Sequence, residues 1–330
     1  MITNNNFRLL ANYGITLKKE SKAFAIIKLY NKEEDVRLSR NLYDKLLNAI
    51  SSASSSTNKL PKTYFGVELE FVGSISWEAS SNFDESMHAL LKESYFNCAS
   101  SYQHNDGKIW ILGRDGSIRW EPDTKIHYPY GYELSSSRME LFNEDDMSTL
   151  KTILDLVKNN LHAEVNESCG THIHIGFDCK GAKREDLKNL LCIYAELESK
   201  VFDPIVPRSR RRNKYCRHTT DQLRAKYQKL SSRYCSFNLF SRDCCKNIHL
   251  ESRQLEGTLD FNTIKYWAIF QATILYDILC MIIEYPDLLN EYRSSLKSKN
   301  IFDILFSYNF DNDVISFFID RVIQFKSRTI

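Results

Sequence analysis

Three segments of the chain place two chemically active side chains two residues apart, in runs that alternate between polar and apolar residues. The pairs are Glu68 with Glu70, His172 with His174, and Glu251 with Arg253. Side chains at positions i and i+2 of a β-strand point to the same face, so each pair predicts a polar strand face with an apolar face behind it. For any single pair, the alternative to a functional site is a polar strand face that is simply exposed to solvent. Three pairs in one chain favour a shared site where the side chains converge on ions.

The side-chain types in these pairs indicate which metal ions such a site would bind. Carboxylates with imidazole and no thiolate favour Mg²⁺ or Mn²⁺ over structural zinc. Such ions bridge the phosphate oxygens of nucleoside triphosphates. The chain has no GxxxxGK[ST] or GxGxxG motif, so metals and arginines would hold the phosphates. Further candidates are Asp115 and Arg119 in "GRDGSIRWEP", and Glu133 in "GYELSS", where the preceding glycine permits close backbone approach.

A strongly basic stretch at 208–233 could supply positive charge to such a site. It contains ten lysines and arginines and a single acidic residue, Asp221. Three interpretations apply: a solvated basic surface, a nucleic-acid contact with stacking tyrosines, or one or two arginines that neutralise a transferring phosphoryl group. For the third, Arg233 is the best single candidate, because "SSRYCSFNLFS" comes just ahead of the predicted strand "HLESRQLEGT".

The elements that must position these side chains follow from hydrophobic periodicity. Strands are predicted at "TYFGVELEFVG", "YGYELSSS", "CGTHIHIGF" and "HLESRQLEGT", and a strand, a turn and a second strand at "KIWILGRDGSIRWEP". Helices are predicted around 82–97, at 144–162 and at 183–201, and helices dominate after the last strand.

The N-terminal region has a character of its own. Two short strands are predicted in "FRLLANYGITLKKESKAFAIIKLY", and "DVRLSRNLYDKLLNAI" has helical spacing. The Ser-rich segment "SSASSSTNKLP" at 51–61 then reads as a linker. We therefore predict a small α+β appendage at 1–58 and a catalytic domain with a helical C-terminal part at 59–330.

The composition is that of an ordinary soluble globular protein. The chain has 330 residues, of which 43% are hydrophobic and 26% charged, and its formal net charge of +2 argues against a general nucleic-acid binder. Nine cysteines without a CxxC pair, and no signal peptide, favour the cytoplasm. The apolar run at 267–285 contains Gln271, Asp277 and Glu284, which favours a buried core helix over a membrane span.

The ordered set of motifs resembles the amidoligase family, which is grouped with glutamine synthetase and glutamate–cysteine ligase. The motifs are "FGVELEF", "GRDGSIRWEP", "GYELSSS", "CGTHIHIGF", "RYCSFNLF" and "ESRQLEGTLD", and the resemblance covers about residues 62–275. It implies an α+β fold with a glutamine synthetase-like catalytic domain, in which a curved antiparallel sheet with flanking helices binds ATP and Mg²⁺ or Mn²⁺ on its concave face.

The same resemblance implies roles for individual residues. The implied metal ligands are Glu68, Glu70, Glu133, His172 and Glu251. His172 would bind metal or face phosphate, while His174 would lie nearer the substrate. Arg253 would contact phosphate, and Asp115 with Arg119 matches an Asp-x-Ser motif of the family. Together with Arg233 from the basic stretch, the expected nucleotide-binding residues are Arg119, Arg233 and Arg253, and the expected catalytic residues are Arg253, His174, Arg233 and Asp115.

The expected activity is an ATP-dependent ligase that forms an amide bond through an acyl phosphate. The substrates would be a carboxylate and an amine on small molecules, peptides or proteins, with Glu256 or His174 as candidate proton acceptors. An oligomer is compatible with the sequence, and no membrane partner is expected. A metal-dependent hydrolase is one alternative, because His-x-His with acidic partners also builds such sites. A nucleic-acid-binding module that uses the basic stretch is another.

Overall fold

The chain forms two compact units. The computed structural model describes residues 10–21, 24–29, 33, 35–51, 60–74, 82–83, 85–87, 95–99, 109–119, 129–177, 182–211, 213–220, 234–239, 248–308 and 310–327. Unit 1 comprises Met1–Lys59, Glu196–Arg208 and Tyr285–Ile330, and unit 2 comprises Leu60–Ala195 and Ser209–Glu284. All of the paired polar residues singled out from the sequence lie in unit 2.

Unit 2 is built on an eight-stranded sheet with the order β10-β11-β9-β4-β7-β6-β5, in which β8 also pairs with β4. The strands are β4 (Thr63–Ser74), β5 (Tyr95–Ala99), β6 (Ile109–Arg114), β7 (Pro129–Ser135), β8 (Met139–Glu140), β9 (Gly170–Phe177), β10 (Phe237–Leu239) and β11 (Ile248–Glu256). Every neighbouring pair is antiparallel except β5 with β6, which is parallel. The predicted α+β class with antiparallel sheets and flanking helices is therefore confirmed, and the finer likeness to glutamine synthetase stays a prediction.

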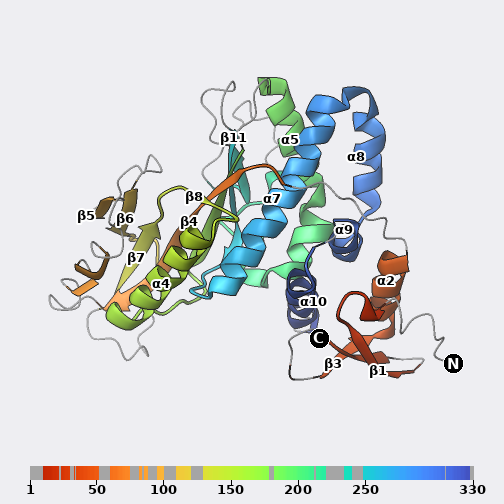
Figure 1. Cartoon of the computed structure of the whole chain (residues 1–330), viewed down its shortest axis with the longest axis horizontal. Helices are drawn as coiled ribbons and strands as arrows, with labels where there is room; N and C mark the ends of the chain where they lie inside the picture. The colour runs from red at the N-terminus through yellow and green to blue at the C-terminus, as the bar shows by residue number, and fades with distance from the viewer. Residues whose placement is uncertain are drawn as a thin grey trace. The chain divides into compact units, whose positions relative to one another are not determined.

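Helices cover one face of this sheet. They include α4 (Glu144–Asn160), α5 (Arg184–Leu197) and α7 (Phe261–Glu284), and Figure 1 shows α4 and α7 running across the sheet. Ile173, Ile175 and Phe177 of β9 are buried, and the ring of Phe177 lies 5.8 Å from that of Tyr276 on α7. Because side chains alternate along a strand, the even-numbered residues of β9, His172 among them, face away from α7.

The start of α4 shows how local sequence fixes an element. The side chain of Asn143 accepts hydrogen bonds from the backbone N–H groups of Asp145 and Asp146, which satisfies donors that a helix start leaves unpaired. Acidic residues occupy the first turn, where the helix dipole favours negative charge. The helix predicted at 144–162 is thus confirmed, with its end at Asn160.

A buried polar cluster joins the helices to the sheet. The hydroxyl of Tyr194 on α5 lies 2.7 Å from Oε1 of Gln271 on α7 and 3.0 Å from Oε1 of Gln254 on β11. Both glutamines are buried, and leaving a buried polar group without a partner costs about 1–3 kcal/mol.

Tyr194→Phe is therefore expected to lower the free energy of unfolding by about 1–3 kcal/mol, because it leaves a glutamine oxygen without its donor. Urea denaturation measures the change. Tyr130→Phe is a suitable control, since Tyr130 is 44% exposed and its hydroxyl can bond to water. Equal stability of the Tyr194 and Tyr130 variants would contradict this account of the cluster.

Unit 1 contains a small sheet and the C-terminal helices. Its three strands pair antiparallel in the order β1-β2-β3. Its elements are β1 (Thr16–Glu20), β2 (Phe24–Lys28), β3 (Asp35–Ser39), α2 (Arg40–Ser51), η1 (Glu198–Phe202), η2 (Asp203–Ile205), η4 (Pro286–Leu288), α8 (Leu289–Ser298), α9 (Ile301–Ser307) and α10 (Asn312–Ser327). The helix α2 packs against α9, and the ring of Tyr13 lies 4.7 Å from that of Phe306. The N-terminal residues therefore share a unit with the C-terminal helices, so a separate appendage is not confirmed and the boundary at 58/59 stays a prediction.

Several predicted elements differ in extent from those in the structure. The helix expected around 82–97 overlaps β5, which begins at Tyr95. The segment predicted to be helical from Asp35 begins with β3, and its helix starts at Arg40. The second strand expected in "KIWILGRDGSIRWEP" lies mostly outside the described residues. A short apolar run fits both the helical period of 3.6 residues and the strand period of two, so its packing partners decide which element forms.

The apolar run at 267–285 lies in α7 as far as Glu284. Among the described residues, α7 is the one helix long and apolar enough to cross a membrane, and 56% of its apolar 18-residue window is buried inside the structure. Trp267, Phe270 and Ile274 are fully buried. Gln271 also reaches its hydrogen-bond partner Tyr194 within the protein. This packing agrees with the interpretation of the run as a core helix.

Candidate metal and nucleotide site

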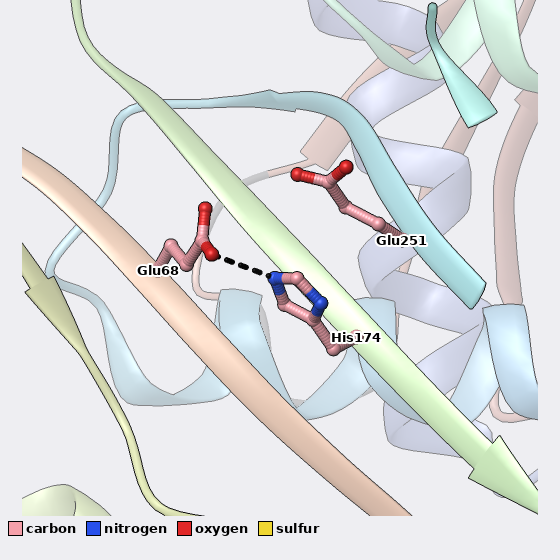
Figure 2. Close-up of side chains that lie close together, drawn as sticks. All are labelled: Glu68, His174 and Glu251. Atoms are coloured by element: carbon pink, nitrogen blue, oxygen red, sulfur yellow. Dashed lines mark ion pairs between the residues drawn. The ribbon is translucent and has the colours of Figure 1, made fainter. Parts of the chain in front are cut away.

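The sheet register brings the three predicted pairs together on one face. Glu68 on β4 lies opposite His172 on β9, and His174 lies opposite Glu251 on β11. Glu70 on β4 lies opposite Glu133 on β7. Figure 2 shows three of these side chains, Glu68, His174 and Glu251, projecting from three neighbouring strands toward the same space. The central strands β4 and β9 therefore hold a row of carboxylates and imidazoles on the face opposite α7.

The ring of His172 sits among three carboxylates. Its Nδ1 lies 2.8 Å from Oε2 of Glu68 and 3.5 Å from Oε1 of Glu251, and its Nε2 lies 3.3 Å from Oε1 of Glu70. The side chain of His172 is 1% exposed. Buried carboxylates in such number need positive charge nearby, so this ring lies where cations would bind.

The second histidine is more open to solvent and has different partners. Nε2 of His174 lies 3.2 Å from Oε1 of Glu68, and its side chain is 16% exposed. Its Nδ1 lies 2.8 Å from Nε2 of His249, a residue of β11. His172 thus lies in the buried carboxylate cluster, while His174 lies at its accessible edge.

Glu251 and Arg253 form a fixed ion pair beside this cluster. Nη1 of Arg253 lies 2.7 Å from Oε1 of Glu251, and the other carboxylate oxygen accepts a hydrogen bond of 2.8 Å from Asn238. The register shifts between Ser252 and Leu255, so two residues of β11 face one residue of β9 there. Such a bulge re-aims side chains, and here Arg253 follows Glu251 onto the site face.

Glu133 and Asp115 extend the cluster toward β6 and β7. The backbone N–H of Asp115 donates to the carbonyl of Gly131, at 2.9 Å. A methyl group at Gly131 would lie 2.5 Å from the carbonyl oxygen of Asp115 and 2.6 Å from the side chain of Ile118. Only glycine fits at this position, and its small size lets the turn that carries Asp115 close over β7 beside Glu133.

The pKa values of Glu68 and Glu133 are shifted in opposite directions. Burial by itself would raise the pKa of Glu68, but the charge of His174 and the hydrogen bond from His172 outweigh it and hold that pKa well below its usual range. Burial raises the pKa of Glu133 well above its usual range, and the negative charges of Glu68, Glu70 and Asp115 raise it further. A cation bound among these crowded carboxylates would offset their mutual repulsion.

His174 responds to the same charges. Burial lowers its pKa, but the charge of Glu68 and the ion pair with it are stronger, so that the pKa is raised overall.

Three groups of side chains in this cluster have ligand atoms within 4.8 Å of one another. They are Glu68 with His174 and Glu251, Glu68 with Glu133 and His172, and Glu70 with Asp115 and Glu133. The donor set is oxygen-rich. Cys169 lies nearby, but burial raises the pKa of its thiol to about 11, so it does not supply a thiolate at neutral pH. This donor set fits Mg²⁺ or Mn²⁺ better than structural zinc.

The remaining predicted residues lie elsewhere or outside the described chain. The side chain of Arg119 is exposed, and its backbone N–H and carbonyl bond to Ser168 and Asn166. Arg233 lies outside the described residues, so its predicted role is untested. Glu256 lies opposite Gly170, one row beyond His172.

Sequence reasoning missed three residues of this face: Asn238, His249 and Arg210. Asn238 holds Glu251, His249 bonds to His174, and Arg210 lies against Gly170. His249 stands two residues before Glu251, so the same alternation could have placed it on the site face. Arg210 belongs to the basic stretch, but the sequence does not distinguish it from its neighbours.

Comparison with known families agrees with these motifs. A family model described as "Putative amidoligase enzyme" matches residues 61–272. This range includes every strand of the eight-stranded sheet. No curated protein matches the chain.

Proposed function

The chain belongs to the amidoligase family, and on this basis we propose that it is an ATP-dependent ligase that joins a carboxylate to an amine. The observation that carries the proposal is the row of carboxylates and imidazoles on one sheet face, with Arg253 beside it. A ligase of this kind must bind a triphosphate and stabilise the charge that moves during phosphoryl transfer. The row of carboxylates suits the metal ions that accompany the triphosphate, and Arg253 suits the phosphoryl group.

The residues present fit Mg²⁺. Glu68, Glu70, Glu133, Glu251 and His172 would hold the ions, as the sequence predicts. The negative charges of Glu68, Glu70 and Asp115 add to burial in raising the pKa of Glu133, which supports cation binding beside these carboxylates. Bound Mg²⁺ would neutralise phosphate oxygens and orient the triphosphate. His174 and Asp115 are further donors within reach.

Arg253 is placed to bind a phosphoryl group. Its guanidinium is tied to Glu251 at one nitrogen and to the carbonyl of Tyr215 at another, at 2.7 and 3.3 Å. Its side chain is 12% exposed, so it is held in place and still accessible. A fixed guanidinium stabilises charge on transferring phosphate without reorganising during the reaction.

The proposed reaction has two steps. An oxygen of the substrate carboxylate attacks the γ-phosphorus of ATP, which releases ADP and gives an acyl phosphate. The amine nitrogen then attacks the acyl carbon, phosphate leaves, and the amine proton passes to a base. His174 is a candidate for that base, because it lies at the accessible edge of the site, and its ring would accept the proton in its neutral form.

The direct test is whether ADP release depends on both an amine and a carboxylate. Purified protein with Mg²⁺ and ATP would be incubated with pools of amino acids, polyamines and peptides, and ADP and amide products would be measured. Amide formation that requires ATP supports the ligase. Hydrolysis of amides or phosphoesters without ATP would instead favour a metal-dependent hydrolase, and salt-sensitive retention on nucleic acid without ADP release would favour a binding module.

Replacement of His172 and of His174 should have different effects on ligand affinity and on turnover. His172→Ala removes a ring buried among three carboxylates, so affinity for Mg²⁺ and for a non-hydrolysable ATP analogue should both fall. His174→Ala should leave analogue affinity nearly unchanged while amide formation falls by ~100-fold, the usual range for loss of a general base. Calorimetric titration and turnover measurements separate these outcomes. Equal and negligible effects of both changes would mean that β9 only has a solvated polar face.

A further inference from the structure

Arg210 is a buried cation on the site face, and the proposed reaction assigns no role to it. It is 4% exposed. A methyl group at Gly170 would lie 2.6 Å from Nη2 of Arg210 and 3.0 Å from both Cζ and Nη1. Gly170 lies two residues before His172 on β9, so its missing side chain would point to the same face as His172. The guanidinium of Arg210 therefore lies over Gly170, in the space that any other residue there would fill.

This position is next to the carboxylate cluster. The backbone N–H of Gly170 donates to Oε2 of Glu70, at 2.6 Å, and Glu70 belongs to the group that also contains Asp115 and Glu133. Arg210 thus lies at the end of the site where ligand groups for a cation gather. It is the last residue of η3 (Arg208–Arg210), so the basic stretch contributes directly to the site.

Arg210 is hydrogen-bonded to Arg253, which is in turn hydrogen-bonded to Tyr215. Nη2 of Arg210 donates to the carbonyl of Arg253, at 2.5 Å, and Nε of Arg253 donates to the carbonyl of Tyr215, at 3.3 Å. In the described part of the chain, Nε of Arg210 is buried and has no hydrogen-bond partner. A buried charged donor without an acceptor is unfavourable, so Arg210 keeps one donor that a ligand oxygen could satisfy.

We propose that the guanidinium of Arg210, which lies over Gly170 and keeps an Nε–H without an acceptor, binds a phosphate-type oxyanion in the site, as a second guanidinium beside Arg253. Guanidinium groups match phosphate oxygens in geometry and charge, and the adjacent carboxylates suit metals that bind the same phosphate. The identification of the oxyanion as part of ATP rests on the proposed function, while the binding of phosphate by Arg210 does not. Gly170 is a glycine because the guanidinium needs its space.

Two substitutions test this proposal, one in Arg210 itself and one in the glycine that it covers. Arg210→Lys keeps the charge and removes the planar Nε–H donor. Gly170→Ala keeps Arg210 and pushes its guanidinium away, since all three atoms nearest to the added methyl belong to Arg210. Affinities for inorganic phosphate and for a non-hydrolysable ATP analogue, each with Mg²⁺, would be measured by calorimetry. The matched control is Arg217→Ala, an exposed arginine of the same stretch.

Both substitutions should weaken the binding of phosphate and of the analogue by roughly tenfold or more, the usual effect of losing a charged hydrogen bond. The double variant should lose little more than either single one, because both remove the same contact. Melting curves would show whether each variant is folded, and a variant that does not fold leaves the decision to the other.

Unchanged affinities in both variants, or an equal loss in Arg217→Ala, would overturn the assignment, the latter because it would indicate a general basic field. If the wild-type protein binds phosphate but not the ATP analogue, the proposed function fails while the phosphate comparison still decides the role of Arg210. Binding of neither ligand by the wild type would overturn both.

Discussion

Glu68→Gln is expected to lower ATP-dependent turnover by at least ~100-fold, because it removes a carboxylate that two candidate metal groups share. Glu68 lies 2.8 Å from His172 and 3.2 Å from His174, so its carboxylate contacts both rings. Gln has nearly the same size and keeps the strand pattern, so folding should survive. Steady-state kinetics with varied Mg²⁺ would show a higher Mg²⁺ requirement as well as a lower maximum rate.

Glu140→Gln is the matched control for this change. Glu140 lies on β8, which pairs with β4, and its carboxylate contacts the exposed Lys62 at 2.7 Å. Surface ion pairs of this type contribute about 0–1 kcal/mol, so the control should retain full turnover. Wild-type activity of the Glu68 variant, with a folded protein, would remove β4 from the proposed metal site.

The polar faces of the strands could be predicted from the sequence because strand geometry is local. Glu68 with Glu70 and His172 with His174 each share a face through alternation alone. The structure adds the register, which places Glu68 opposite His172 and Glu251 opposite His174. Register depends on contacts between distant segments, here 104 residues apart for Glu68 and His172, and no local pattern encodes it.

The role of individual arginines, in contrast to the polar strand faces, could not be predicted from local sequence. The sequence pointed to Arg233 because it stands next to a motif, and that prediction stays untested because Arg233 lies outside the described residues. All ten cations of the basic stretch look alike in sequence, and among those that the structure describes only tertiary packing distinguishes Arg210, which is buried over Gly170. The two glycines that matter, Gly131 and Gly170, carried a usable signal, since each stands two residues before a site residue, Glu133 or His172, in a strand.

The division into units could be predicted only in part. The Ser-rich segment at 51–61 suggested a boundary, and the two units divide between Lys59 and Leu60. The sequence did not indicate that α2 packs against α9, more than 200 residues later. Amphipathic helices indicate that a partner face exists without identifying the partner.

Glu133→Gln is expected to be more stable than the wild type without metal and less stable than the wild type with Mg²⁺. Its pKa in the folded chain is raised, by burial first and then by Glu68, Glu70 and Asp115, above the value of about 4.3 for an unfolded chain. The folded wild type therefore holds an extra proton, and its stability falls as pH rises from the unfolded pKa toward the folded one. Gln needs no proton, so the variant should melt roughly 2–4 °C higher in EDTA at pH 7, the shift that about 1 kcal/mol gives.

With saturating Mg²⁺ the order should invert, because ion binding stabilises the folded wild type and the variant has lost one ligand. The advantage of the variant in EDTA should also shrink toward pH 4, where Glu133 is protonated in both folded and unfolded wild type. Glu140→Gln again serves as the control, with little change under either condition. If the Glu133 variant were less stable than wild type in EDTA and stabilised equally by Mg²⁺, Glu133 would be a structural carboxylate, and the ligand groups that contain it would have to be abandoned.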